Sequence, residues 1–442
     1  MSAPSSRKIW DIAWPIMLSL VAQNIVNITD TAFLGRIGEV ELGASAIGGL
    51  LYTTLFMVAF GFTTGVQILV ARRNGEKNYL AIGRIFDNSF YFLGIISLII
   101  TSVVILFGPA LLKPFMASEA VFKASSTFLV YRVLGLFFAS AGLLFRSFYT
   151  GITFTKYLSI SSAIMAGVNV VLDYALIFGH WGFPRLGIQG AGIASSISEV
   201  CALLFFILIT WRNTRLKQYV LFKLVKPDFG IIKSTLGISV FVMLQYVLSL
   251  GSWFVFFMFI EKMGERPLAV SNIIRSLYLM FMIPGWALCS VTSTLVSNAL
   301  GEGKPQSVIP IIKKIMKFSV AAMTITVALA ALFPRQAIAI YTNDVSLIEA
   351  TVPSYYIILA ATFLFMAMSI LFNGVLGTAN TKFALGIEVI TLIIYLTCAW
   401  LFAVKLHLRI EYVWTAEFVY SSSIGILSYW YLKKGNWRSK VV

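Results

Sequence analysis

Charged side chains are scarce in this sequence. They make up 12% of its 442 residues, whereas hydrophobic residues make up 59%. Soluble domains carry about 25% charged residues because their surfaces face water, so this composition excludes a soluble protein and fits a lipid environment. Histidine and cysteine are also scarce, with two and three copies. All three cysteines lie in apolar runs, so neither a disulfide framework nor a metal motif is indicated.

Motifs of the common enzyme classes are missing as well. The sequence has no Walker, kinase, serine-hydrolase, HExxH or deaminase pattern. Neither nucleotide hydrolysis nor a covalent mechanism is therefore supported. We expect a protein that is not an enzyme and that carries no cofactor.

Long apolar runs dominate what is present. A helix needs about 20 residues to cross a bilayer, and twelve segments reach that length. Continuous runs exclude a strand-based barrel, which needs short alternating segments. Polar residues and the lack of a clear cleavage site favour a membrane helix over a signal peptide for the first run. The predicted spans are 10–34, 43–71, 85–107, 127–151, 157–179, 189–211, 235–260, 268–299, 311–333, 351–377, 383–404 and 411–432.

Basic residues are divided unevenly between the two ends of these spans. If successive spans cross the membrane in alternating directions, 22 Lys and Arg residues fall on one side of the membrane, 9 on the other and 3 within spans. Basic loops face the cytoplasm, so we predict a multi-pass protein of the plasma (inner) membrane with both termini cytoplasmic. The net charge of +16 is then an orientation signal, and no nucleic-acid partner is required.

The chain also repeats itself at an offset of 226 residues. The informative matches are loop pairs, because apolar identities arise easily by chance. Two pseudo-symmetric six-helix bundles follow, related by an axis along the membrane normal: residues 1–212, a basic cytoplasmic linker at 213–233, and residues 234–442. The matches are Gly38-Glu39 with Gly264-Glu265, Gly75-Glu76 with Gly301-Glu302, and Thr155-Lys156 with Thr381-Lys382.

Ionisable residues inside the spans are the functional candidates, because each costs at least ~2.5–3.5 kcal/mol at a helix centre. Asp30 shares a helix face with Gln23, Asn27 and Thr31, and such a polar stripe must face a wet cavity. Asp30 lies about 7 Å, and Asp173 and Ser195 about 9 Å, from the outer ends of their spans by helical rise.

Asn169 lies one turn deeper than Asp173. Two carboxylates at one depth would not both be ionised easily, so the cluster suits a proton that is taken up outside and released inside. Alternatively, Asp30, Asn169 and Asp173 offer oxygen ligands for Na+. Either aspartate could also simply bond an exposed backbone group at a helix irregularity.

Several other polar residues within the spans have open roles. Glu199, near mid-membrane, is either a proton partner or a satisfied interhelical hydrogen bond. Glu388 and Glu417 lie near span ends, where a reach to the interface is expected, and Arg146 and Arg275 are expected to snorkel. The candidate residues for a substrate cavity are Gln23, Asn27, Thr31, Gln67, Glu199 and Gln245.

These residues resemble the multidrug and toxic compound extrusion (MATE) family over nearly the whole chain. That family exports cationic, amphipathic organic compounds in exchange for H+ or Na+ through two six-helix lobes. The resemblance implies a coupling-ion site at Asp30, Asn169 and Asp173, with Ser195 where Thr is common. The matching stretches are Trp14-Pro15, Asn27 to Gly38, Val70 to Gly75, Asn169 to Asp173 and Gly187 to Ser195.

The second half departs from one branch of that family. Where that branch carries Glu and Asp in the seventh and tenth spans, this chain has Gln245 and Phe365. By the repeat offset, Asp30 and Asp173 also correspond to uncharged residues. The resemblance is therefore to the DinF-like branch, with ion coupling confined to the first lobe.

The expected function is a cation-coupled secondary antiporter that exports amphipathic organic cations by alternating access. A flippase for lipids or lipid-linked oligosaccharides, from the same superfamily, is the alternative. Its cavity would be lined with Arg and Lys to hold pyrophosphate, whereas the cavity candidates here are acidic or neutral. A channel would instead show flux without counter-ion stoichiometry. The expected partners are small organic cations and the bilayer, and the expected state is a monomer.

Overall fold

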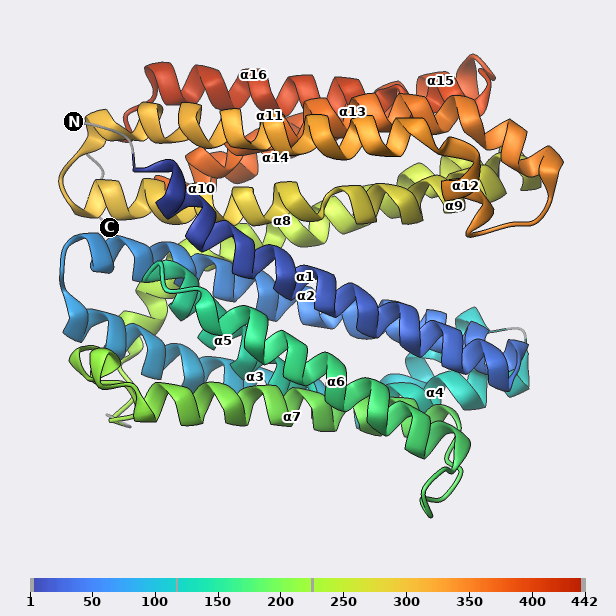
Figure 1. The fold of residues 1–442 in the computed structure, drawn as a ribbon, viewed down its shortest axis with the longest axis horizontal. Coiled ribbons are helices and arrows are strands. Elements are labelled where there is room, and N and C mark those ends of the chain that lie inside the picture. The colour runs from blue at the N-terminus through green and yellow to red at the C-terminus, as the bar shows by residue number, and fades with distance from the viewer. Residues whose placement is uncertain (1–3, 117, 224–225, 439–442) are drawn as a thin grey trace. The chain divides into compact units, whose positions relative to one another are not determined.

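The computed structural model describes residues 4–116, 118–223 and 226–438, and every regular element among them is a helix. The chain forms two compact units, residues 14–243 and residues 244–442 together with 1–13. Within each unit long helices run side by side (Figure 1). The all-α membrane fold expected from the sequence is confirmed, whereas the domain boundaries at 212 and 234 stay a prediction.

Seven α-helices precede the connection between the halves among the described residues. α6 and α7 pack together along their lengths, and α2 packs on both α4 and α5. One apolar cluster, which includes Leu34, Phe128 and Ile177, closes the end of this unit where α1 and α6 finish. The helices are α1 (Ser6–Ile37), α2 (Glu39–Gly75), α3 (Tyr79–Leu112), α4 (Glu119–Val133), α5 (Leu136–Gly151), α6 (Lys156–Phe178) and α7 (Ile188–Arg212).

Nine further α-helices follow in the part of the chain that the structure describes. In the unit of residues 244–442, α13 packs on α16, α11, α10 and α9, and its core holds Tyr355, Tyr395 and Trp414 with almost no exposure. The helices are α8 (Phe229–Glu261), α9 (Glu265–Phe281), α10 (Ile283–Gly301), α11 (Val308–Leu332), α12 (Pro334–Ala339), α13 (Val345–Gly377), α14 (Thr381–Trp400), α15 (Ile410–Trp414) and α16 (Ala416–Lys434).

Local sequence explains where several helices begin and end. The Asn78 side chain accepts a hydrogen bond from the Ala81 backbone amide at the start of α3. The Asp344 side chain accepts one from the Ser346 backbone amide at the start of α13. α6 ends at Gly179, whose φ of +78° is the left-handed conformation that glycine adopts at helix ends.

Two predicted spans are bent. α4 and α5 meet at 49°, and α9 and α10 meet at 48° where Pro284 begins the new helix. Counting each bent pair as one span, the described residues contain up to 11 helical segments long and apolar enough to cross a membrane. The twelfth predicted span, 411–432, forms α15 and α16 instead of one helix.

The first break lies at Gly135, where α7 approaches closely. A Cβ atom at this position would lie 3.0 Å from the Cα atom of Ser196 and also against the Glu199 carboxylate. Glycine therefore allows α7 to pack against the α4–α5 bend. This contact brings side chains of α4 and α7 into one cavity.

The connection between the halves is packed onto α3. The backbone amide of Phe222 donates to Asp87 Oδ1 at 3.1 Å, and that of Asp228 donates to Asn88 Oδ1 at 2.7 Å. A short helical turn, Thr214–Tyr219, precedes these bonds. The predicted linker is thus bonded to the unit of residues 14–243 at both of these points.

Candidate functional site

A cavity of about 540 Å³ lies within the unit of residues 14–243. Helices α1, α2, α4, α5, α6 and α7 all contribute to its wall. Six of the ten residues singled out in the sequence line it: Gln23, Asn27, Asp30, Thr31, Ser195 and Glu199. Its apolar wall includes Phe56, Met57, Phe60, Phe138, Met165 and Phe206.

An acidic pair lies at this cavity. Asp30 lines it from α1, and the carboxyl of Asp173, on α6, lies close enough for a proton on one to bond the other. Asn169 and Ser195 also face the Asp30 carboxyl, and Asn169 Nδ2 donates to Ser195 Oγ at 3.4 Å. The structure thus brings the four predicted ion-site residues together.

Four oxygens of this cluster lack donors among the described residues. Among the described residues, no hydrogen-bond partner exists for Asp30 Oδ1, for either carboxyl oxygen of Asp173, or for Asn169 Oδ1. Asn169 and Asp173 have no exposure at all. Buried polar atoms normally have partners, so a set of bare acceptors is suited to a proton or to a hard cation.

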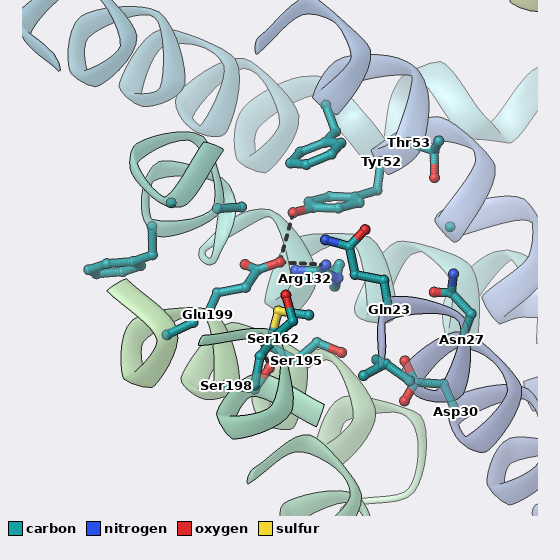
Figure 2. Close-up of a pocket in the computed structure, with 18 of the residues that line it drawn as sticks. Gln23, Asn27, Asp30, Tyr52, Thr53, Arg132, Ser162, Ser195, Ser198 and Glu199 are labelled. Carbon is teal, nitrogen blue, oxygen red and sulfur yellow. Dashed lines mark hydrogen bonds and ion pairs between the residues drawn. The ribbon is translucent and has the colours of Figure 1, made fainter. Parts of the chain in front are cut away.

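A second charged group lines the cavity from α4 and α7. Arg132 Nη2 donates to Glu199 Oε1 at 2.7 Å, and the Tyr52 hydroxyl approaches the same oxygen at 3.4 Å. The Arg132 guanidinium lies 3.9 Å from the Tyr52 ring centroid. Figure 2 shows the Glu199 carboxylate joined by dashed lines to the Tyr52 hydroxyl and to Arg132, with Asp30 and Asn27 on the other side of the view. Glu199 is therefore an ion-paired residue that bridges two helices.

Arg146 differs from the sequence expectation. Instead of reaching toward a membrane interface, its side chain lines the cavity from α5, and its Nη1 donates to Ser162 Oγ at 3.1 Å. Sequence reasoning missed both Arg132 and Arg146 as cavity residues. The cavity is consequently not only acidic and neutral, because two guanidinium groups also line it.

Glu388 and Glu417 also differ from the expectation of a reach to the interface. They are 1% and 3% exposed. Glu388 Oε1 accepts from Ser249 at 2.7 Å and from Tyr420 at 2.9 Å. Glu417 accepts from two further tyrosine hydroxyls, on α9 and α14. Both glutamates are therefore hydrogen-bonded core residues of the unit of residues 244–442.

Two cavity candidates do not line this cavity. Gln67 lies on α2 outside its lining. Gln245 belongs to the other unit and is 7% exposed, and its Oε1 has no donor among the residues that the structure describes. Phe365, also in that unit, packs against the Tyr420 ring with centroids 5.6 Å apart.

The profile of the MatE family matches residues 15–175 and 242–401. The chain belongs to the MatE family. The two matches begin and end almost one repeat offset apart, as expected for a duplicated bundle. The predicted resemblance is thus confirmed at the level of the family, whereas the DinF-like branch stays a prediction.

Several curated relatives share a name. The chain is 25% identical over 340 residues to a probable multidrug resistance protein NorM of Brucella suis, covering 75% of this chain and 71% of the relative. It is also 25% identical over 375 residues to a protein of the same name from Thermotoga maritima, covering 84% and 79%. This MatE chain is a membrane transporter and not an enzyme.

Solved structures share the fold. An outward-facing multidrug resistance MATE family transporter of the MOP superfamily matches with a TM-score of 0.88 and 18% identity, covering 98% of this chain and 96% of that one. A MOP superfamily transporter from Pyrococcus furiosus, described as having a binding pocket of reverse polarity, matches with a TM-score of 0.87 and 18% identity over 97% and 96%. These matches show that the chain shares the fold of these transporters.

Proposed function

We propose that this MatE transporter exports amphipathic organic cations in exchange for H+ or Na+, by alternating access. The observation that carries the proposal is the set of bare carboxyl and amide oxygens at Asp30, Asn169 and Asp173 beside a cavity with an aromatic wall. The names of the curated relatives support multidrug efflux as the process.

In this proposal, the coupling ion and the cationic substrate compete for the same negative charge. Asp30 lines the cavity, so its carboxylate attracts a cationic substrate through a medium of low dielectric constant. A proton or Na+ that enters between Asp30 and Asp173 removes this attraction and favours substrate release. Ion release on the opposite side restores it. We propose that the transporter acts as a monomer in the inner membrane, with both termini in the cytoplasm.

The test is dye efflux from proteoliposomes, driven separately by a pH gradient and by a sodium gradient. We expect one gradient to drive efflux of a cationic rhodamine, and Asp30→Asn to abolish that efflux with normal protein levels. Asp11→Asn is the matched control, because Asp11 lies at the exposed start of the same helix. Near-normal efflux by Asp30→Asn would refute the assignment, and dye flux without any driving ion would indicate a channel.

A flippase for lipids or lipid-linked oligosaccharides is the second candidate, and the two cavity arginines favour it. A pyrophosphate needs several cationic donors. Glu199 already pairs with Arg132, so Arg146 is the cation that remains for a ligand. One cation suits a single anionic group better than a pyrophosphate, so efflux of smaller compounds is the better supported proposal.

A further inference from the structure

Arg146 is a cation at the cavity without an anionic partner. No carboxylate of the described residues lies within 4.0 Å of its nitrogen atoms, although the ion pairs of other arginines are evident. Among the described residues, its side chain bonds only Ser162 Oγ. That hydroxyl in turn lies 2.6 Å from Ser19 Oγ on α1, so the two serines already share one bond.

A guanidinium in this position has unused capacity. It carries five N–H donors in a planar fork and stays charged in proteins, and one hydroxyl satisfies few of them. Withdrawing such a charge from water without an anion is costly. An oxyanion that enters the cavity would accept two N–H groups at once, which is the strongest hydrogen-bonding arrangement available to arginine.

The cavity carries a positive group and a negative group at different positions along its length. Ser19 and Asp30 are both on α1, eleven residues apart, which separates them by about 16 Å along the helix axis. The cationic Arg146–Ser162–Ser19 group and the acidic Asp30 group therefore lie at different depths. Residues such as Phe138, Met165 and Phe206 supply an apolar wall.

The two cavity arginines provide an internal comparison. Arg132 is neutralised by Glu199 at 2.7 Å, so it does not require an anion from a ligand. Arg146 has the Ser162 hydroxyl in the corresponding place, and Ser162 is in turn bonded to Ser19. Only the second arrangement leaves net positive charge for an incoming group.

We propose that Arg146 is an anion-binding subsite of the cavity and holds the carboxylate or phosphate of an amphipathic substrate. The apolar body of this substrate lies along the phenylalanine and methionine wall, and its cationic end approaches Asp30. The preferred substrates are thus zwitterionic amphiphiles rather than simple cations. This inference rests on the proposed function, because it assigns the substrate class of the same cavity.

A structural role for Arg146 would have a different signature. If the residue only ties α5 to α6 through Ser162, replacing it would weaken the binding of every ligand equally. An anion subsite would instead discriminate between ligands that differ in one carboxylate. Rhodamine 110 and rhodamine 123 form such a pair, because rhodamine 123 is the methyl ester of rhodamine 110.

The experiment is fluorescence-anisotropy binding of both dyes to the full-length transporter in lipid nanodiscs. We expect Arg146→Gln to weaken rhodamine 110 binding by roughly tenfold or more, the size of a lost charged hydrogen bond, and to change rhodamine 123 binding less than about twofold. Arg146→Lys keeps the charge without the fork and should weaken rhodamine 110 binding by a smaller factor. Arg275→Gln, in the other unit, is the matched control and should alter neither dye.

Equal weakening of both dyes, or no change in rhodamine 110 binding, would overturn the anion subsite. If Arg146→Gln does not fold, the test uses Arg146→Lys and compares its loss of affinity for rhodamine 110 with its loss of affinity for rhodamine 123. Rhodamine 123 tests the proposed function separately. If the wild type binds this dye and exports it in an ion-driven way, but Arg146→Gln does not selectively lose rhodamine 110 binding, the proposed function stands and the subsite is refuted. Binding of neither dye by the wild type would refute both.

Competition identifies the source of the anionic group. Displacement of rhodamine 110 by 2-naphthoate indicates a small organic acid, whereas displacement by dihexanoyl phosphatidic acid, but not by dihexanoyl phosphatidylcholine, indicates a lipid headgroup. Either displacement should vanish in Arg146→Gln at matched dye occupancy. Failure of both competitors would contradict the proposed anion chemistry.

Discussion

The two units both bury carboxylates, but they treat them differently. In the unit of residues 14–243, Asp30 lines a cavity and Asp173 packs against it with both oxygens bare. In the unit of residues 244–442, Glu388 and Glu417 accept hydrogen bonds from serine and tyrosine hydroxyls. Asp173 is thus as buried as Glu388 and Glu417 and Asp30 is partly exposed, whereas bare carboxyl oxygens beside a cavity belong to the first pair. Free lone pairs, not burial, indicate where an exchangeable ion can bind.

The repeat sharpens this contrast. The position that corresponds to Asp30 in the second half is Phe256, which is 1% exposed and packs its ring on Tyr395 and Trp414, with centroids 5.5 and 5.1 Å away. One copy of the ancestral helix therefore carries an acid beside a cavity, and the other carries a core aromatic. The two MatE repeats therefore differ at this position, with a carboxylate beside a cavity in the first and an aromatic core residue in the second.

The largest effect is expected from Asp173→Asn. The amide cannot carry the exchanged charge, so ion-driven efflux should fall by at least about tenfold, measured in proteoliposomes at equal protein content. Glu388→Gln makes the same kind of change at a buried carboxylate of the other unit and should retain efflux. Equal losses in the two variants would break the distinction between the units.

An intermediate effect is expected from Glu417→Gln, and on stability rather than on transport. Glu417 accepts from Tyr395 at 2.9 Å and from Tyr278 at 3.3 Å, and an amide can replace only one of its acceptor oxygens. The loss should be about 1–3 kcal/mol, observed as a lower melting temperature of the purified protein. Tyr278→Phe, which removes the longer bond, should lower it less. Unchanged melting with abolished efflux would make Glu417 a coupling residue.

The smallest effect is expected from Gln245→Ala. Its side-chain oxygen has no donor among the described residues, so its removal breaks no hydrogen bond of that atom. Efflux should stay within about twofold of the wild type in the proteoliposome assay. Complete loss of ion-coupled efflux would show that the second half of the chain takes part in ion coupling.

Part of this arrangement was predictable from local pattern. Run length and the repeat predict the helices, because a bilayer fixes how long an apolar helix must be. Depth counted from span ends predicts that Asp30 and Asp173 lie at one level, and helical spacing adds Asn169. These inferences need only the geometry of single helices.

The remaining features depend on contacts between helices. Arg132 meets Glu199 because α4 is broken beside Gly135 and α7 packs there, which no periodicity reveals. Depth alone likewise could not distinguish a snorkelling Arg146 from one that lines a cavity. The glutamates of the second unit find tyrosine partners on neighbouring helices, so their distance from a span end did not predict their role.

The bare backbone at Gly135 has an evolutionary consequence. Any side chain there would push α7 away and separate the guanidinium of Arg132 from the carboxylate of Glu199. Loss of the glycine would therefore disturb an ion pair whose two members both line the cavity. Replacing both charges would not by itself free this position, because the Cα atom of Ser196 would still lie 3.0 Å from a new Cβ atom.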